Sequence, residues 1–255
     1  MKKITAMLLV LTMLLAFAGC GASEKAPETT AAPETTAAPE TTAAPETTAP
    51  AETEPAVMTH TDYVAAELDS PVCVETYVQA HQSWWDNKIT VYAQSQDGAY
   101  FIYEMACTEE DAAKLEPGTK IRVSGFKGEW AGEVEIMDAT FEIVEGDTYV
   151  AEPTDVTELL GTDELIAHQN EKVIFKGLTV SKVEYKNGEP GDDIYVTLGY
   201  NGGSYSFCVE VYLTGTDSDV YTTVGQLNVG DTVNVEGFLY WYEGMNPHIT
   251  SITLA

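Results

Sequence analysis

From about residue 57 onward, the apolar positions of the chain alternate with polar ones in the short pattern of β-strands. Hairpin signals, "QDG" at 96–98 and "NGG" at 201–203, stand at corresponding places in the two halves of this region. The pattern predicts five strands in each half. They cover residues 72–80, 88–95, 99–107, 120–127 and 133–144, then 172–183, 193–200, 204–213, 231–242 and 248–254.

Helix signals interrupt the strand pattern twice in each half. "TEEDAAKLE" at 108–116 predicts a short helix between the third and fourth strands, with Thr108 and Asp111 in the spacing of a capping box. The matching stretch of the second half, "SDVYTTVGQL", carries a weaker helix signal. A further short helix is expected before the first strand of each half, capped by Thr61 or Thr154.

The two halves repeat each other in sequence. "LEPGTKIRVSGF" at 115–126 matches "LNVGDTVNVEGF" at 227–238, which aligns Gly125 with Gly237. A glycine inside an alternating run is typical of a strand bend or bulge. A repeat of about 100 residues predicts duplicated domains. The expected boundaries are residues 57–150 and 151–255.

Five strands with a helix between the third and fourth resemble the OB-fold barrel, and the shared "VxGF" motif adds to the likeness. The resemblance covers residues 57–255. It implies a mainly β protein with two tandem five-stranded OB-like barrels. The alternative is a pair of immunoglobulin-like sandwiches, each of which needs about seven strands.

The first 56 residues have a different composition. Lys2 and Lys3 precede an apolar run that ends in "LLAFAGC". This stretch resembles a bacterial lipoprotein signal peptide (residues 1–20), which implies a lipid on Cys20 and a protein anchored to the extracytoplasmic face of the cell membrane. The alternative is a secretory signal cleaved elsewhere. Residues 21–56 repeat "APETTA" without an apolar face, which predicts a disordered tether that could reach on the order of 100 Å.

Charge narrows the choice of partners. The chain carries a net charge of −29 at pH 7. Residues 57–150 hold 18 acidic and 5 basic residues, and residues 151–255 hold 16 and 4, so neither half has a basic surface. Because non-specific affinity for nucleic acids comes mainly from Lys and Arg, this charge disfavours a nucleic acid as partner.

No stretch of the sequence has the spacing of a catalytic or metal-binding motif. The acidic runs at 189–193 and 217–219 lack the spacing of a calcium loop and are interpreted as solvated loops. We therefore expect neither an enzyme nor a resident metal or cofactor. Apart from Cys20, the cysteines are Cys73, Cys107 and Cys208, expected as buried thiols, with a Cys73–Cys107 disulfide as the alternative.

The resemblance places ligands on strands two and three, between the loop after strand one and the loop that joins strands four and five. If Glu104 faces outward, alternation puts Tyr100 on the same face, and Tyr92 faces outward on the neighbouring strand. Of the paired tryptophans after strand one, we expect one ring to close the core and the other to be exposed. The candidate ligand-binding residues are Trp84, Trp85, Tyr92, Tyr100 and Trp130 in the first half and Tyr195, Tyr212, Tyr240 and Tyr242 in the second.

Exposed rings stack on sugars, on bases and on apolar protein surfaces. The competing interpretation is that these rings seal the barrel ends or pack on the second domain. The sequence predicts a non-enzymatic cell-surface lipoprotein that acts as a binding or adaptor module for an unknown extracellular ligand or protein. The alternatives are an extracellular carbohydrate-binding protein and a single-stranded nucleic-acid-binding OB-fold protein, the latter disfavoured by acidity.

Overall fold

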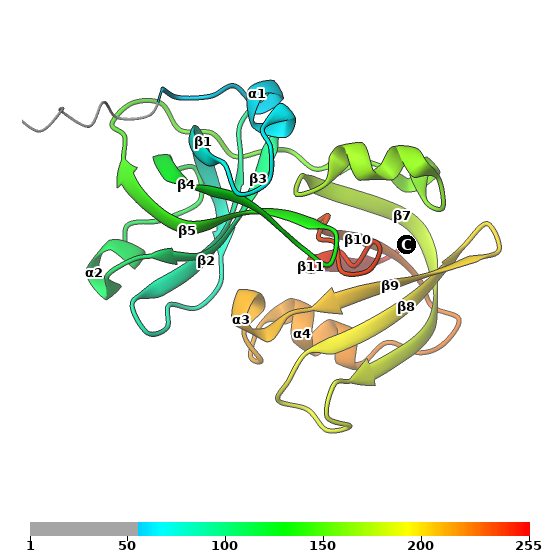
Figure 1. Cartoon of the computed structure of the whole chain (residues 1–255). Helices are drawn as coiled ribbons and strands as arrows, with labels where there is room; N and C mark the ends of the chain where they lie inside the picture. The colour runs from blue at the N-terminus through cyan, green and yellow to red at the C-terminus, as the bar shows by residue number, and fades with distance from the viewer. Residues whose placement is uncertain (1–55) are drawn as a thin grey trace, which may run out of the picture. The chain divides into compact units, whose positions relative to one another are not determined.

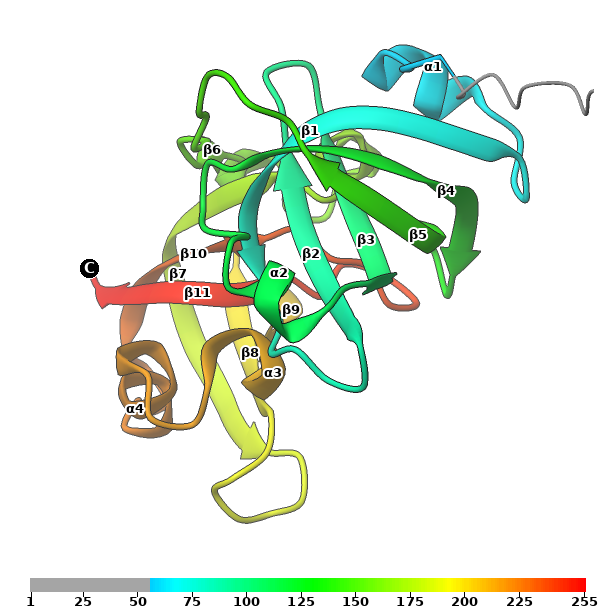
Figure 2. The same ribbon diagram turned by 90° about the vertical axis from the view of Figure 1, so that its left-hand side faces the viewer.

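The computed structural model describes residues 56–255, which are mainly β (Figures 1 and 2). The first half forms a closed barrel whose strands pair in the order β1-β2-β3-β5-β4. Its strands are β1 (Pro71–His81), β2 (Lys88–Gln94), β3 (Ala99–Ala106), β4 (Lys120–Trp130) and β5 (Glu133–Ile143). Two short helices, α1 (His60–Ala65) and α2 (Glu109–Ala112), accompany the barrel.

The second half forms a six-stranded sheet with the order β10-β11-β9-β8-β7-β6, in which β10 also pairs with β7. The five strands other than β6 therefore follow the same pairing order as the first barrel. They are β6 (Thr154–Asp155), β7 (Lys172–Tyr185), β8 (Ile194–Tyr200), β9 (Gly203–Val209), β10 (Thr232–Phe238) and β11 (His248–Leu254). Its helices are η1 (Thr157–Leu159), η2 (Asp163–His168), α3 (Val211–Thr214) and α4 (Asp219–Gly225).

The strand predictions agree with the structure to within a few residues at most ends, whereas the third strand of the second half ends early and gives way to α3. The expected Thr108 cap is present, since its side chain accepts the backbone N–H of Asp111. The other two caps were wrong. Thr59 rather than Thr61 caps α1, and Thr154 lies in β6, where the expected helix is replaced by 3₁₀ turns.

The repeated glycines stand where two strands come too close for a side chain. The register of β4 against β5 shifts between Ser124 and Phe126, and that of β10 against β11 shifts at Gly237. A Cβ on Gly125 would lie 2.6 Å from the carbonyl oxygen of Met137, and one on Gly237 would overlap the carbonyl of the facing strand. The prediction of a bend or bulge is confirmed at both glycines.

Aromatic rings join the barrel to the second sheet. Tyr92 of β2 stacks on Phe238 of β10 with ring centroids 4.6 Å apart, and its hydroxyl is 2.6 Å from Nδ1 of His248. Tyr240 stacks on the same imidazole at 4.2 Å and packs edge-on against Phe101 of β3 at 5.2 Å. The outer face of β2 and β3 is thus covered by the second sheet over much of its length.

A buried carboxylate adds polar contacts at this interface. Glu133 is fully buried, and its Oε2 accepts hydrogen bonds from the backbone N–H of Trp241 at 2.7 Å and from Nε2 of Gln169 at 3.2 Å. Nε2 of Gln169 also donates to the carbonyl of Gly132 at 2.8 Å. Oε1 of Glu133 has no hydrogen-bond partner.

Cys73, Cys107 and Cys208 are free and buried, as the thiol interpretation predicts, and the alternative disulfide is not formed. The signal peptide, Cys20 and all but the end of the tether lie outside the described residues. Within residues 56–255, no helix has the length and apolar character needed to span a bilayer.

An aromatic groove between the barrel and the second sheet

The paired tryptophans directly precede a tight turn, and their rings lie in different surroundings. Asp86 and Asn87 both have positive φ, 49° and 61°, which is the geometry of a type I′ hairpin turn. Trp85 and Lys88 exchange backbone hydrogen bonds across it, at 3.0 and 2.9 Å. Trp84 packs on the barrel core and donates Nε1–H to the carbonyl of Cys107 at 2.9 Å, whereas Trp85 is 69% exposed. The expectation of one core ring and one exposed ring is confirmed.

A β-bulge in β3 places two side chains beside Trp85. The register of β2 against β3 shifts between Ile89 and Val91, and Glu104 has a positive φ of 45°. Its N–H donates to Oγ1 of Thr90 at 3.1 Å instead of to a strand carbonyl. Its carboxylate accepts from Lys88 Nζ at 2.7 Å and from the Tyr103 hydroxyl at 3.2 Å.

The same bulge overturns the face predicted for Tyr100. Alternation counted back from Glu104 puts Tyr100 outside and Tyr103 inside. The extra residue shifts the count by one, so Tyr100 is buried in the barrel core at 1% exposure and Tyr103 is 44% exposed. Tyr92 does point away from the barrel core, as predicted, but the second sheet covers it and leaves 2% exposed.

Tyr212 supplies the opposite wall of the groove from the second half of the chain. It lies in α3, whose first turn is capped by Glu210: the carboxylate accepts the N–H groups of Tyr212 at 3.2 Å and Leu213 at 2.8 Å. Burial raises the pKa of Glu210 to about 7, against the lowering effect of these hydrogen bonds. The carbonyl of Tyr212 accepts the N–H of Ser83 at 2.6 Å, which fixes α3 against the β1–β2 connection (Figure 2).

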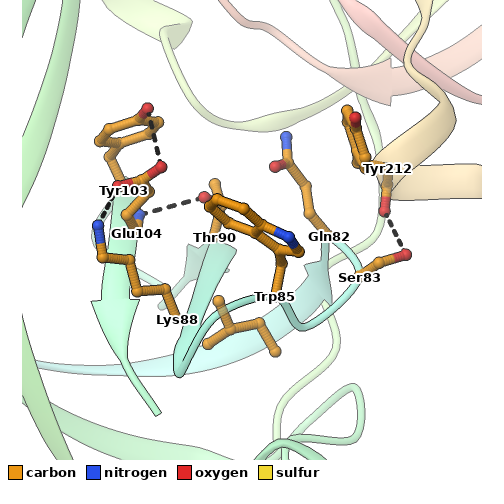
Figure 3. A pocket seen from close by; sticks show the side chains of 9 residues that line it. Gln82, Ser83, Trp85, Lys88, Thr90, Tyr103, Glu104 and Tyr212 are labelled. Carbon is orange, nitrogen blue, oxygen red and sulfur yellow. Dashed lines mark hydrogen bonds and ion pairs between the residues drawn. The ribbon is translucent and has the colours of Figure 1, made fainter.

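These elements enclose a cavity of about 360 Å³, called the aromatic groove below. Figure 3 shows Trp85 between the Tyr103–Glu104–Lys88 side and Tyr212. Three partly exposed rings supply flat apolar faces, and amide, hydroxyl, ammonium and carboxylate groups lie between them. The groove is lined by Gln82, Ser83, Trp85, Lys88, Ile89, Thr90, Tyr103, Glu104 and Tyr212.

The predicted ligand-binding residues do not converge on one face. Trp85 and Tyr212 line the aromatic groove. Trp130 is 61% exposed at the β4–β5 turn, and Tyr242 is 50% exposed in the β10–β11 connection, but neither lines the groove. Trp84, Tyr92, Tyr100, Tyr195 and Tyr240 are buried or partly buried.

The other groove residues were missed, namely Gln82, Ser83, Lys88, Ile89, Thr90, Tyr103 and Glu104. The "DN" pair at Asp86–Asn87 was an available signal for a tight turn, which would have placed Lys88 beside Trp85. No comparable signal marks the bulge.

Two carboxyls and one imidazole near the interface with the second sheet also have strongly shifted pKa values. Burial raises the pKa of Glu133 to about 8 and that of Glu135 to about 7. Burial lowers the pKa of His248 to about 4, so its imidazole is neutral at pH 7. Within residues 56–255 there is no cluster of three His, Cys, Asp or Glu side chains arranged to hold a metal ion.

Comparisons with known proteins give likeness only at the level of solved structures. No family model matches the chain, and no curated protein matches it. A murine DNA-binding protein bound to double-stranded DNA is 12% identical, with a TM-score of 0.36 over 72% of this chain and 96% of that one. The Ifi202 HINa domain in complex with 20-bp double-stranded DNA is also 12% identical, with a TM-score of 0.34 over 73% and 96%.

A replication protein A heterotrimer bound to single-stranded DNA is 12% identical, with a TM-score of 0.29 over 71% of this chain and 50% of that one. These similar structures hold DNA, and the sequence-based expectation that nucleic acid is an unlikely partner is withdrawn on that finding. The likeness is too low to assign DNA binding to this chain.

Proposed function

We propose that the protein is a non-enzymatic binding module that holds a ring-bearing ligand in the aromatic groove. The observation that carries the proposal is the exposure of Trp85, Tyr103 and Tyr212, at 69%, 44% and 63%, around one cavity. Aromatic side chains that remain in water around a cavity offer stacking faces for flat ligands. Stacking of a base on an aromatic ring contributes about 1–3 kcal/mol.

We further propose that the second sheet is a second OB-like barrel, so that two tandem copies form the ligand site together. The pairing of β10 with both β11 and β7 supports this assignment. In this arrangement the first barrel supplies Trp85 and the bulge, and the second supplies Tyr212. The ligand site then belongs to the pair of barrels and to neither copy alone.

The anchoring of this module is part of the same proposal. The signal at residues 1–20 and the repeated tether support a lipoprotein held by Cys20 on the extracytoplasmic face of the cell membrane. Two or more acyl chains hold a protein stably to a bilayer where one gives only reversible binding. The tether would then present the aromatic groove at a distance from the membrane.

The binding proposal is tested with Trp85→Ala and Trp130→Ala, because both tryptophans are exposed and both precede a two-residue turn. A panel of oligosaccharides and single-stranded oligonucleotides is titrated against each variant by calorimetry. We expect Trp85→Ala to lose binding by about tenfold or more and Trp130→Ala to match the unaltered protein. The proposal fails if no member of either class binds, or if Trp85→Ala binds as well as the control.

Anchoring is tested separately by expressing the full chain and Cys20→Ala in a bacterium with a lipoprotein pathway. Mass spectrometry of the mature N-terminus should find a diacylglyceryl group on Cys20, and the protein should sediment with membranes. Cys20→Ala should leave the membrane fraction. An unmodified N-terminus cleaved at another residue would contradict the lipoprotein assignment without bearing on the groove.

A further inference from the structure

We propose that the ligand of the aromatic groove is a carbohydrate, with one sugar ring stacked on Trp85 and its hydroxyls bonded to the cluster of Lys88, Tyr103 and Glu104. This inference rests on the proposed function and names its ligand class. The cluster is bonded internally, by Lys88 Nζ to Glu104 Oε2 at 2.7 Å and by the Tyr103 hydroxyl to Glu104 Oε1 at 3.2 Å. It nevertheless keeps free hydrogen-bonding capacity.

The capacity can be counted from the chemistry of the groups. An ammonium has three donors, and Lys88 directs one of them to Glu104. A carboxylate has about four lone-pair sites, and Glu104 uses two of them in the bonds to Lys88 and Tyr103. The side chains of Lys88 and Glu104 are 45% and 35% exposed, so the remaining donors and acceptors are within reach of a ligand.

Donors and acceptors therefore stand side by side at one end of the groove. A sugar hydroxyl both donates and accepts, so a hydroxyl placed between Lys88 and Glu104 can bond with both. Two neighbouring hydroxyls of a ring would satisfy the pair further. The groups that line the middle of the groove, Gln82 and Thr90, have the same dual character.

The backbone that holds Glu104 in place is strained. Glu104 is a non-glycine residue with φ of 45°, a backbone conformation that side chains other than glycine rarely adopt. The hydrogen bond from its N–H to Thr90 Oγ1, at 3.1 Å, holds the strained conformation. As a result, Tyr103 and Glu104 both face the groove. In a regular strand these two neighbours would lie on opposite faces.

The stacking faces complete the match. The C–H faces of a sugar ring are apolar, and its hydroxyls project around the edge, so a ring lying on Trp85 directs hydroxyls toward the polar cluster. The volume of about 360 Å³ lies at the low end of the roughly 300–1,000 Å³ of small-molecule sites. It suits a short segment of a glycan rather than a long stretch.

The test is a glycan array that covers the common pyranoses in both anomeric linkages, followed by calorimetry with the tightest oligosaccharide. The variants are Glu104→Gln, which removes charge but keeps the shape, Tyr103→Phe, Trp85→Ala and the control Trp130→Ala. We expect Glu104→Gln and Trp85→Ala each to weaken binding about tenfold or more, Tyr103→Phe to weaken it less, and the control to bind normally. Thermal unfolding of each variant checks that the fold is intact. If Trp85→Ala or Glu104→Gln disturbs the fold, Tyr103→Phe still tests the polar cluster, because it removes one hydroxyl and keeps the ring.

Each other outcome overturns the assignment. If no glycan binds but single-stranded oligothymidine binds and depends on Trp85, the carbohydrate assignment falls and the ring-binding groove stands. If neither class binds, both the assignment and the proposed function fall. If glycans bind equally to Glu104→Gln and Trp85→Ala, the carbohydrate site lies elsewhere on the protein.

Discussion

Replacing Glu133 by glutamine should change how the stability of the protein depends on pH. The carboxyl is fully buried, and burial raises its pKa from the ordinary value of 4.5 to about 8. In the unfolded chain the carboxyl loses its proton near its ordinary pKa. Between pH 4.5 and 8 the folded state therefore binds more protons than the unfolded state, and the free energy of unfolding falls as pH rises. Above pH 8 the full cost of a buried, ionised carboxylate is present.

The size of this effect follows from the pKa change. Because each pKa unit corresponds to about 1.4 kcal/mol, the rise from 4.5 to about 8 corresponds to on the order of 5 kcal/mol of lost stability between pH 4.5 and pH 9. The amide introduced by Glu133→Gln has no charge and can keep the acceptor that faces Trp241. The variant should therefore lack this loss, while the loss that arises from Glu135 and Glu210 remains.

The assay is urea denaturation of Glu133→Gln and of the unaltered protein at pH 5 and pH 9, with unfolding monitored by tryptophan fluorescence. The variant should be equal or less stable at pH 5, since its amide gains no new partner, and clearly more stable at pH 9. Glu129→Gln is the control, because Glu129 is exposed on the neighbouring strand β4. Parallel loss of stability in Glu133→Gln and the unaltered protein from pH 5 to pH 9 would refute the reasoning.

Three further predictions test the packing by urea denaturation. Trp84→Ala should lower the free energy of unfolding by roughly 2–4 kcal/mol, because it removes core contacts and a hydrogen bond. Trp85→Ala should lower it by less than about 0.5 kcal/mol, and equal losses would contradict the assignment of the two rings. Gly237→Ala should lower the free energy of unfolding by roughly 1–3 kcal/mol or more, because its Cβ would overlap a facing carbonyl. The control Gly199→Ala makes only ordinary contacts and should be tolerated. An unchanged stability of Gly237→Ala would contradict the close approach of the two strands. Tyr92→Phe should cost roughly 1–2 kcal/mol through loss of its buried hydrogen bond at the interface, and no change would show that this bond adds nothing to stability.

The strands, the hairpins and the matching positions of the two glycine bends were predictable because each depends on local sequence. Alternating apolar residues give a strand, "NGG" gives a type I′ turn with positive φ at Asn201 and Gly202, and a glycine in an alternating run marks a close approach. The repeat then supplied a second example of the same pattern. These signals were sufficient for the five strands of the barrel.

The site was predicted only in part, because two of its determinants are not local. The bulge at Glu104 depends on a register shift against Ile89 and on a hydrogen bond to Thr90, and neither is visible in the alternation of β3. A one-residue shift exchanges the two faces of a strand, which is why Tyr100 and Tyr103 changed places. Tyr92 on the outer face of β2 was a candidate for ligand binding, with packing on the second domain as the alternative, because the sequence does not show what covers that face.

That covering also explains why the groove lies at the edge of the barrel. Phe126 and Phe238 occupy matching positions in the repeat, yet Phe126 is 44% exposed and Phe238 is 3% exposed, stacked on Tyr92. The phenylalanine of the second copy of the motif thus covers the outer face of the first barrel, whereas its counterpart in the first copy remains exposed. What remains open is the end of β2 and β3 beside α3, where the Trp85 turn and the Glu104 bulge extend past the covered region. Removing the second half of the chain would therefore expose Tyr92 and Phe101 to water and take away Tyr212, so it would dismantle the groove instead of freeing a larger binding face.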